Sequence, residues 1–448
     1  MSTNNQRKKS DIAKQKSIVF DDLVIQSPKR TAAVQQGWHA FFPYYAGYPE
    51  NFAREILKSA RLNQTAVILD PWNGSGTTTF SASQLGLASQ GIDLNPIMLI
   101  IARARLLPPS EADSIESLAR EMLKTVRGDD KLVSDDDPLL GWFYRPTAIF
   151  IREIERRIRV HLIGDRTVTP GGPKLENISG LAATFYVALF SVCRHLTGRY
   201  RSTNPTWLRK PKRGENRITA SHEKILSTLH ANLKSMATTL SECDARKIEY
   251  GAVTLRVADS TKTVLPASSI DFVLTSPPYC TRIDYSAATR IELALLHPLL
   301  NLRMEDLGRK MIGSTRVPDH KIAIQPTWGN TCARFLEKLK AHPSKASDGY
   351  YLKTHLDYFD KMAAALANIS GALKTQGAAV LVVQDSFYKE IHNDLPTMTI
   401  EMAANAGLRL RRRCDFPLKR SMSGINPHSR IYERPAGALE AVLCFDKT

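Results

Sequence analysis

Residues 66–96, AVILDPWNGSGTTTFSASQLGLASQGIDLNP, contain the pattern that decides the fold. An apolar run ending in Asp70 leads into a loop with glycines at 74 and 76, and a helical stretch follows through Leu85. A second short strand then ends in Asp93. A glycine loop between a strand and a helix, with an acidic residue ending the next strand, is typical of α/β sheets that bind nucleoside cofactors. The stretch therefore predicts a β-loop-α-β unit with its binding site at the strand carboxyl ends.

Residues 268–285, SSIDFVLTSPPYCTRIDY, predict a second strand end that carries chemistry. The strand 270–274 runs into two prolines, which have fixed φ angles and no N–H groups. The carbonyl of Pro277 should therefore point outward from a rigid strand end, beside the hydroxyl of Ser276 and the ring of Tyr279. Two acceptors and a flat ring suit an exocyclic amine on a planar heterocycle. A proline-rich surface loop is the alternative interpretation.

Together, the two stretches resemble motifs of the DNA amino-methyltransferases. The matching segments are 70–78 (DPWNGSGTT) and 275–279 (TSPPY), and the likeness extends over roughly 38–105 and 250–448. This family transfers a methyl group from S-adenosylmethionine to N4 of cytosine or N6 of adenine, without a metal. The SPPY form resembles the cytosine branch, because the adenine branch more often has Asp or Asn before the prolines. The resemblance thus implies a DNA methyltransferase with N4 of cytosine favoured over N6 of adenine.

The resemblance also implies which residues hold the cofactor. Asp93 and Leu94 would contact the ribose, while Asp259 and Ser260 would contact the adenine. The methionine and ribose side would be lined by the first strand end and its loop, namely Asp70, Pro71, Asn73, Gly74, Ser75, Gly76 and Thr77. For Asp259, a turn cap is the alternative role. The aromatic run 39–48 resembles a family segment that packs over the methionine end, although an ordinary core patch would look the same.

The catalytic residues implied by the resemblance are Ser276, Pro277, Pro278 and Tyr279. By accepting the two amine hydrogens, Ser276 Oγ and the Pro277 carbonyl would favour a tetrahedral nitrogen and aim its lone pair at the methyl group. Tyr279 would stack on a base flipped out of the duplex. Cys280 raises the covalent route of cytosine-C5 methylases, but in those enzymes the cysteine directly follows the proline. An activated thiolate would also need a basic neighbour, so this route is disfavoured.

Composition indicates a polyanionic partner. The 448 residues include 61 Lys and Arg against 44 Asp and Glu, a formal net charge of +17. With the motifs above, this excess favours double-stranded DNA. The six cysteines occur singly, without a C-x-x-C pair, and neither a signal peptide nor an apolar run of spanning length is evident. The sequence therefore predicts a cytoplasmic protein with no membrane contact.

The chain is predicted to be one methyltransferase domain interrupted by a helical insertion. Residues 1–17 are expected to form a disordered basic arm, and 38–106 begin the domain. Residues 107–250 show recurrent helical patterns and form a candidate DNA-recognition region. Residues 251–448 complete the domain, with a long helix at 283–301 and a loop-rich insertion at 303–350. Alternating helices and strands that close on two consecutive strands predict a doubly wound α/β sheet with an antiparallel edge. This resembles the seven-stranded, Rossmann-like class I methyltransferase fold.

Within the insertion, the basic segment (residues 197–213, TGRYRSTNPTWLRKPKR) interleaves basic and aromatic side chains. Basic groups contact phosphates, and aromatic rings stack on bases or wedge between them. The residues predicted to contact DNA are Arg199, Arg201, Trp207, Arg209, Lys210, Lys212 and Arg213. A basic loop that is merely exposed is the alternative.

Three functions stay open from the sequence. The first is a DNA amino-methyltransferase in restriction–modification or phage defence, whose restriction or defence subunit would be a separate chain. The second is an RNA base methyltransferase, against which Ser276 argues because its relatives usually have Asp or Asn there. The third is a catalytically inactive DNA-binding subunit, against which the intact motifs argue.

Overall fold

The computed structural model describes residues 18–29, 41–43, 47–124, 126–164, 175–201, 208–242, 249–280, 284–300, 304–314, 316, 320–418 and 438–448. The predicted arm 1–17, half of the aromatic run 39–48 and Trp207 lie outside these residues. Among the described residues, no helix is long and apolar enough to cross a membrane.

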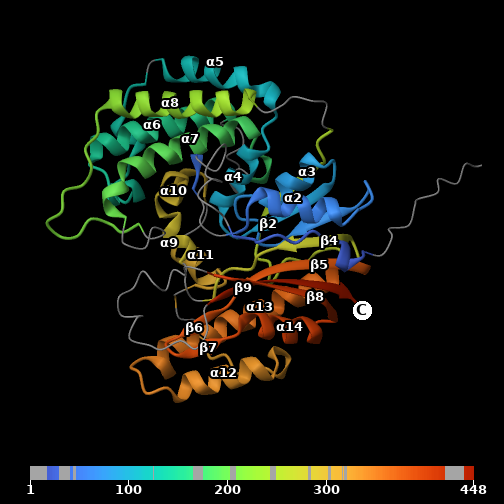
Figure 1. Ribbon diagram of the computed structural model, residues 1–448. Helices are drawn as coiled ribbons and strands as arrows, with labels where there is room; N and C mark the ends of the chain where they lie inside the picture. Colours follow the sequence, from blue (N-terminus) through green and yellow to red (C-terminus); the bar gives the residue numbers. More distant parts are fainter. Residues whose placement is uncertain are drawn as a thin grey trace, which may run out of the picture.

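A seven-stranded sheet runs through the centre of the described chain (Figure 1). In spatial order its strands are β3 (Val253–Val257), β2 (Ala88–Asp93), β1 (Val67–Asp70), β4 (Ile270–Thr275), β5 (Leu373–Gln384), β9 (Leu439–Lys447) and β8 (Leu408–Pro417). β9 is antiparallel to both of its neighbours, whereas the pairs from β3 to β5 are parallel. This order and these directions are those of the class I methyltransferase fold, so the predicted doubly wound, Rossmann-like sheet is confirmed.

Helices cover both faces of the sheet, which explains why the central strand β4 is buried along its whole length instead of alternating between buried and exposed residues. In β4, Phe272 and Leu274 belong to the core on one face, while Val273 belongs to the core on the other. The covering helices are α2 (Glu50–Ser59) and α3 (Thr77–Gln84) on the first face, and α13 (Leu352–Ala372) and α14 (Leu395–Asn405) on the second.

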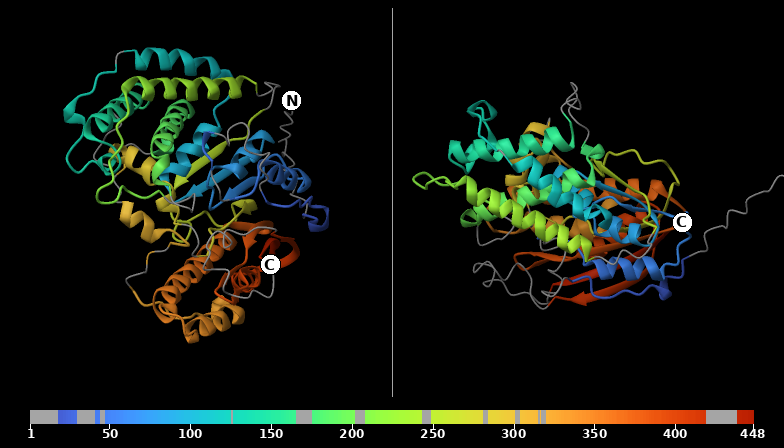
Figure 2. Two further views of the ribbon diagram at one scale, coloured as in Figure 1. Left: turned by 60° about the vertical axis from the view of Figure 1, so that its left-hand side comes forward. Right: turned by 90° about the horizontal axis from the view of Figure 1, so that it is seen from above.

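Four long helices form a helical lobe at one side of the sheet, as the left-hand view of Figure 2 also shows. They are α5 (Ala112–Leu123), α6 (Arg145–Leu162), α7 (Gly180–Leu196) and α8 (His222–Ser241). The lobe lies within the predicted insertion 107–250. Its apolar side chains form one cluster with those of α4 (Pro96–Arg105), the helix that follows β2. The lobe is therefore continuous with the core of the sheet domain.

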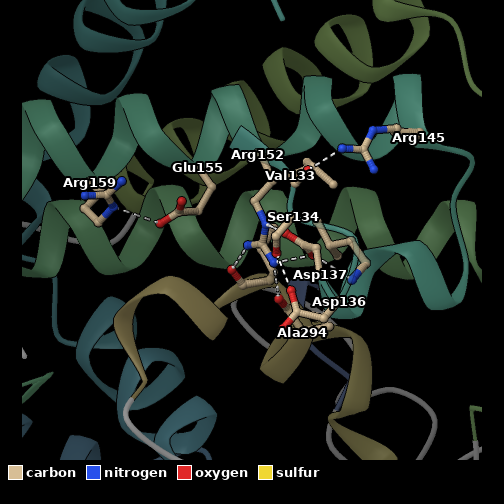
Figure 3. A network of polar contacts seen from close by, with 11 residues as sticks. Val133, Ser134, Asp136, Asp137, Arg145, Arg152, Glu155, Arg159 and Ala294 are labelled. Atoms are coloured by element: carbon tan, nitrogen blue, oxygen red, sulfur yellow. Dashed lines mark hydrogen bonds and ion pairs between the residues drawn. The ribbon is translucent and has the colours of Figure 1, made fainter. Parts of the chain in front are cut away.

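A buried arginine ties the lobe to the segment that follows β4 (Figure 3). Arg152 of α6 donates to both carboxylate oxygens of Asp137, at 2.7 and 2.9 Å. It also donates to the carbonyls of Ala294 and Leu295, at the end of α10 (Arg290–Leu295). Arg152 is only 2% exposed, so this charge depends on all of these partners. The lobe and α10 are thus held together as one unit.

The predicted long helix at 283–301 is wrong in one respect, because it is broken. The structure has α9 (Tyr285–Ala288), α10 and a 3-10 turn at His297–Leu299. Thr289 leaves the helical conformation at φ −116° and ψ 22°. Its hydroxyl donates to the Tyr285 carbonyl at 3.1 Å and accepts a hydrogen bond from Asn95 Nδ2 at 2.9 Å. The break is therefore set by a contact with the start of α4, which local periodicity does not reveal.

The described part of 303–350 contains the helices α11 (Met304–Lys310) and α12 (Asn330–Ala341). A 3-10 turn at Pro326–Trp328 precedes α12, and a π-helical turn at Ser347–Tyr351 follows it. After β5, the short strands β6 (Ser386–Tyr388) and β7 (Ile391–Asn393) form an antiparallel pair. Figure 1 places α12 and this pair on the side of the sheet opposite the helical lobe.

Candidate cofactor and substrate cleft

The carboxyl ends of β1 to β4 surround a cleft of about 970 Å³, measured with its open mouth. In the sheet, β1 lies between β2 and β4, where the strand order changes direction, and doubly wound sheets bind their ligands at such switch points. All four predicted catalytic residues line this cleft, and so do most of those predicted to hold a cofactor. The lining residues from these two sets are Asp70, Pro71, Asn73, Gly74, Ser75, Thr77, Asp93, Leu94, Asp259, Ser260, Ser276, Pro277, Pro278 and Tyr279.

Asp70 holds the two central strand ends together. Its Oδ1 accepts hydrogen bonds from the Thr275 hydroxyl at 2.6 Å and the Trp72 N–H at 3.1 Å, and its Oδ2 accepts one from the Thr78 hydroxyl at 2.7 Å. Tyr48 completes the group through its hydroxyl, 2.5 Å from that of Thr78. Burial raises the pKa of the Asp70 carboxyl to about 6, against the lowering effect of these hydrogen bonds. Asp70 therefore shapes the cleft as well as lining it.

The glycine loop is fastened to the end of β2 by Asp93. The Asp93 carboxylate accepts hydrogen bonds from the Gly74 N–H at 2.9 Å and the Asn95 N–H at 2.8 Å. The Asn73 N–H donates to the Ile92 carbonyl at 2.9 Å. Burial raises the pKa of Asp93 to about 6. Each carboxylate oxygen keeps a further lone pair, so Asp93 can still accept hydrogen bonds from a ligand's hydroxyl groups.

Gly76 has a different position from the other predicted cofactor residues, because it is not among the residues that line the cleft. It precedes α3 in a left-handed conformation, with φ +79°. A Cβ at this position would lie 2.7 Å from the Cβ of Ala102 in α4. Glycine is required here by the turn and by the close approach of α4. Gly76 therefore allows α4 to pack against the start of α3.

Asp259 lines the cleft and also caps a turn. Its Oδ1 accepts hydrogen bonds from the Thr261 N–H at 2.9 Å and the Thr261 hydroxyl at 2.6 Å. The carbonyl of Ser260 accepts a hydrogen bond from Asn368 of α13 at 2.9 Å. The turn cap and the cofactor role are compatible, because both bonds to Thr261 use the same one of the two carboxylate oxygens.

The SPPY segment (residues 276–279) is held in place by hydrogen bonds from three directions. The Ser276 hydroxyl donates to the carbonyl of Val382 in β5 at 3.0 Å. The Tyr358 hydroxyl of α13 donates to the Pro278 carbonyl at 3.0 Å. The Tyr279 N–H donates to the Tyr285 hydroxyl at 3.1 Å. None of these three bonds uses the Pro277 carbonyl. This is expected, because the neighbouring prolines supply no local N–H donor.

The commitment of the Ser276 proton has a chemical consequence. A hydroxyl has one hydrogen and two lone pairs, and here the hydrogen goes to Val382. Toward the cleft, Ser276 Oγ can therefore act as an acceptor. Together with the Pro277 carbonyl, this gives the cleft a pair of acceptors on adjacent residues.

Further lining residues were not named individually from the sequence, although Gly47 and Tyr48 belong to the aromatic run 39–48. They are Gly47, Tyr48, Trp72, Asn95, Met98, Ala258, Tyr285, Lys310, Met311 and Ile312. Several are direct neighbours of assigned residues, and Tyr48 ends the aromatic run, so proximity in sequence could have identified them. Tyr285 lies six positions beyond Tyr279 and had no recognised signal.

The stretch 310–312 reaches the cleft through tertiary contacts. Gly313, at φ +77°, lies so close to the SPPY segment that a Cβ there would be 2.4 Å from the Tyr279 carbonyl. From α13, Lys361 donates to the carbonyls of Arg309 and Met311 at 3.0 and 3.3 Å. No pattern in the sequence connects these residues.

Cys280 lies beside the SPPY segment but belongs to the core. It is 2% exposed, clusters with Cys332 and Trp328, and is not among the lining residues. A covalent role would require the thiol to face the cleft.

The described residues predicted to contact DNA lie on the helical lobe, outside the cleft. Arg290 of α10 donates to the Leu208 carbonyl at 3.3 Å, which places this part of the lobe beside the segment following β4. Arg209 pairs with both oxygens of Glu215 at 2.5 and 2.9 Å. Arg199 donates to the Asn216 carbonyl at 2.7 Å. Among the other residues predicted to contact DNA, those with exposed side chains are Arg201, Lys210, Lys212 and Arg213.

Sequence comparison finds relatives among curated methyltransferases. The chain is 25% identical over 289 residues to the type II methyltransferase M.BsoBI of Geobacillus stearothermophilus, covering 58% of this chain and 53% of that protein. It is 29% identical over 147 residues to the type II methyltransferase M.MjaII of Methanocaldococcus jannaschii, covering 32% of this chain and 26% of that one. The chain thus spans about half or less of these relatives. No family model matches the chain.

Solved structures with similar coordinates are also methyltransferases. A TehB-like SAM-dependent methyltransferase from Corynebacterium glutamicum has a TM-score of 0.27 and 10% identity, over 88% of each chain. The rRNA methyltransferase aviRa from Streptomyces viridochromogenes has a TM-score of 0.27 and 14% identity, over 95% of this chain and 92% of that one. With such TM-scores, the fold assignment rests on the strand order and directions given above.

Proposed function

We propose that the chain is an S-adenosylmethionine-dependent methyltransferase acting on an exocyclic base amine in double-stranded DNA, with N4 of cytosine favoured over N6 of adenine. The observation that carries the proposal is the SPPY segment at the carboxyl end of β4. Its Ser276 hydroxyl is committed as a donor to Val382, in the same cleft as the glycine loop. The two type II methyltransferase relatives support methyl transfer. The motif resemblance and the net charge of +17 support DNA as the substrate.

The cleft fits the proposed cofactor in chemistry. Asp93 offers carboxylate lone pairs to ribose hydroxyls, and Asp259 offers an acceptor to the adenine amine. Met98, Leu94 and Ala258 supply apolar wall. When bound, S-adenosylmethionine supplies a methyl group activated by its positively charged sulfur.

The proposed contribution of the protein is to orient the amine. The nitrogen of such an amine is a poor nucleophile, because its lone pair is delocalised into the ring. Ser276 Oγ and the Pro277 carbonyl would accept its two hydrogens, which draws the nitrogen toward tetrahedral geometry and aims the lone pair. Holding the reactants in this geometry is the main source of acceleration in such a site. Tyr279 would stack on the flipped base.

The helical lobe is the proposed DNA-contacting region. Lys210, Lys212, Arg201 and Arg213 are exposed there and can pair with phosphates. Through Arg152 and Arg290, the lobe is joined to the segment that follows the SPPY segment. A duplex held on the lobe would therefore keep a defined position relative to the cleft. A role in restriction–modification or phage defence, beside a separate subunit, is part of the proposal.

The experiment is mass spectrometry of nucleosides from a methylation-free host that expresses the protein. DNA and RNA are analysed separately, and Ser276→Ala is the impaired control. N4-methylcytosine in DNA, strongly reduced with the variant, is the expected result. N6-methyladenine in DNA would mean that adenine, and not cytosine, is the target base. A new methylated nucleoside in RNA would mean that RNA, and not DNA, is the substrate. Normal cofactor binding by a wild-type protein that leaves both nucleic acids unmodified would contradict the proposed activity.

A further inference from the structure

Tyr285 occupies a position that the proposed reaction does not yet use. It is the first residue of α9 and lines the cleft together with Ser276, Pro277 and Tyr279. Its hydroxyl accepts a hydrogen bond from the Tyr279 N–H at 3.1 Å. This N–H follows the two prolines of the SPPY segment, which have none. The SPPY segment therefore presents acceptors to the cleft, while its nearest N–H donor is consumed by Tyr285.

The hydroxyl of Tyr285 still has its own hydrogen. A phenol is both a donor and an acceptor, and no acceptor for this hydrogen occurs within the part of the chain that the structure describes. Burial raises the pKa of Tyr285, which outweighs the lowering effect of the hydrogen bond from the Tyr279 N–H. The group therefore stays protonated at neutral pH and can donate. The Tyr279 N–H is used in the bond to Tyr285, and the O–H of Tyr285 can act as a donor in its place.

The backbone of Tyr285 is fixed from both sides of the cleft. Asp284 caps α9, because its Oδ1 accepts hydrogen bonds from the Ala287 N–H at 2.9 Å and the Ser286 hydroxyl at 2.6 Å. Thr289 links the Tyr285 carbonyl to Asn95, which begins α4 directly after β2. This is the same contact that breaks the predicted long helix. The break therefore allows Tyr285 to sit at a short, anchored turn beside the SPPY segment.

The proposed substrate carries a matching group. In cytosine, the ring nitrogen N3 is bonded to the carbon that bears the amine, and in adenine N1 has the same relation to its amine. Both nitrogens are acceptors next to a donor amine, on the edge by which flipped bases are read. A cleft that holds the amine with two acceptors needs a donor beside them to bind this nitrogen. A carbonyl in the same ring position, as in thymine or guanine, carries a ring N–H beside it and would oppose such a donor.

We infer that Tyr285 is a specificity-determining residue that donates a hydrogen bond to the ring nitrogen adjacent to the amine of the target base. This inference rests on the proposed function. Ser276 Oγ and the Pro277 carbonyl read the amine as a donor, and Tyr285 reads its neighbour as an acceptor. The pair of requirements selects bases with an amine beside an unprotonated ring nitrogen.

The test combines a protein variant with a substrate variant. The substrate is a duplex containing the methylation site mapped in the host DNA, with the target base either natural or replaced by its deaza analogue. The analogue is 3-deazacytosine if the product is N4-methylcytosine, or 1-deazaadenine if it is N6-methyladenine. Each has C–H in place of the ring nitrogen and keeps the amine. Single-turnover methylation rates are measured for the wild type, Tyr285→Phe and Tyr358→Phe.

For the wild type, we expect the deaza base to be methylated roughly ten-fold more slowly than the natural base, the usual size of one hydrogen bond. For Tyr285→Phe the natural base should be slowed by a similar factor, and the deaza base should bring little further loss. Tyr358→Phe is the matched control, because its hydroxyl donates to Pro278 of the same segment but Tyr358 does not line the cleft. This control should keep the full penalty for the deaza base.

The outcomes separate the two levels of the proposal. If Tyr285→Phe and the deaza base slow the reaction by independent, multiplying factors while methylation proceeds, the role of Tyr285 is overturned and the proposed function stands. The wild type supplies a test that does not depend on the folding of any variant, since equal rates on the natural and deaza bases would also overturn the inference. If no methylated base is found in any nucleic acid, the proposed function is wrong, and the role of Tyr285 that rests on it is wrong as well.

Discussion

The cleft and the basic segment contain most of the polar residues that the sequence analysis selects. The side chains of the two regions have different kinds of hydrogen-bond partner. In the cleft, Ser276 and Asp70 bond to groups on other strands, more than a hundred positions away for Val382 and Thr275. In the basic segment, Arg209 bonds to Glu215, six positions away and exposed. Buried, long-range partners give a group one fixed orientation, whereas an exposed, local pair exchanges readily with water and phosphate.

This difference predicts where mutations act. Changes in the cleft should alter chemistry and stability strongly, because their partners cannot rearrange. Changes in the basic segment should alter affinity for DNA moderately and in proportion to charge. The four predictions that follow test this contrast.

The largest effect is expected for Ser276→Ala. It removes one of the two proposed acceptors and also the bond that links the SPPY segment to Val382. Turnover should fall by about 100-fold, the usual consequence of misplacing reactants by an ångström. Cofactor affinity should change little. Single-turnover methylation and cofactor titration measure the two quantities separately. Ser269→Ala is the control, because Ser269 lies just before the same strand and its hydroxyl makes an exposed hydrogen bond to the Pro266 carbonyl. Normal turnover by Ser276→Ala would remove Ser276 from the proposed chemistry.

The second prediction concerns Asp70→Ala. Removing this carboxylate leaves the buried hydroxyl of Thr275 without its acceptor, while the Thr78 hydroxyl keeps the Leu274 carbonyl at 3.1 Å. The free energy of unfolding should decrease by about 3 kcal/mol, the upper end of the cost of a buried unsatisfied group. Asp70→Asn is the milder comparison, since it keeps one oxygen acceptor. Denaturant unfolding measures both. A loss smaller for Ala than for Asn would mean that Asp70 does not hold the strand ends.

The third prediction is a pH dependence. Burial raises the pKa of Asp70 and Asp93 to about 6, whereas an unfolded Asp titrates near 3.9. Between pH 4 and 6 the folded protein therefore binds more protons than the unfolded chain, so stability should decrease as pH rises through this window. One such proton changes the free energy by up to about 1.4 kcal/mol per pH unit.

Asp93→Asn should flatten the dependence of stability on pH, as measured by thermal unfolding. Cofactor affinity should change in the opposite sense, because ionised Asp93 is the stronger acceptor. Equal slopes for the variant and the wild type would show that Asp93 does not titrate there.

The smallest effect is expected in the basic segment. Glu215→Gln should release Arg209 from its ion pair and steepen the salt dependence of DNA binding by up to about one unit of slope. Replacing Lys212 and Arg213 with glutamine should flatten the same slope by a similar amount for each charge. Fluorescence anisotropy with a duplex at several salt concentrations measures both. If neither variant changes the slope, the DNA surface lies elsewhere.

The strand ends explain why much of the cleft was predictable. In a parallel sheet, carboxyl ends of neighbouring strands meet at one edge, so Asp70, Asp93 and Ser276 had to lie near one another once their strands were recognised. Gly76 shows where this reasoning stops. Its motif position was known, but its packing against Ala102 depends on how close α4 approaches.

Side chains that come from irregular segments were not predictable. Met311 and Ile312 reach the cleft because Lys361 and Gly313 hold their segment against Tyr279. Likewise, the periodicity of 283–301 predicts one helix, whereas Asn95 breaks it through Thr289. Such contacts join residues that are far apart in the chain, and hydrophobic periodicity reports only local burial.

By itself, the sequence determined the doubly wound sheet, the insertion after β2 and the residues at the strand ends, because these follow from local patterns and from the geometry common to parallel sheets. The tertiary structure alone decided which groups are free to act. It commits the Ser276 proton to Val382, makes the Tyr285 hydroxyl the acceptor of the Tyr279 N–H, and pairs Arg209 with Glu215. Hydrogen-bonding capacity is limited to a few protons and lone pairs per group, so what remains for function depends on the partners that folding supplies.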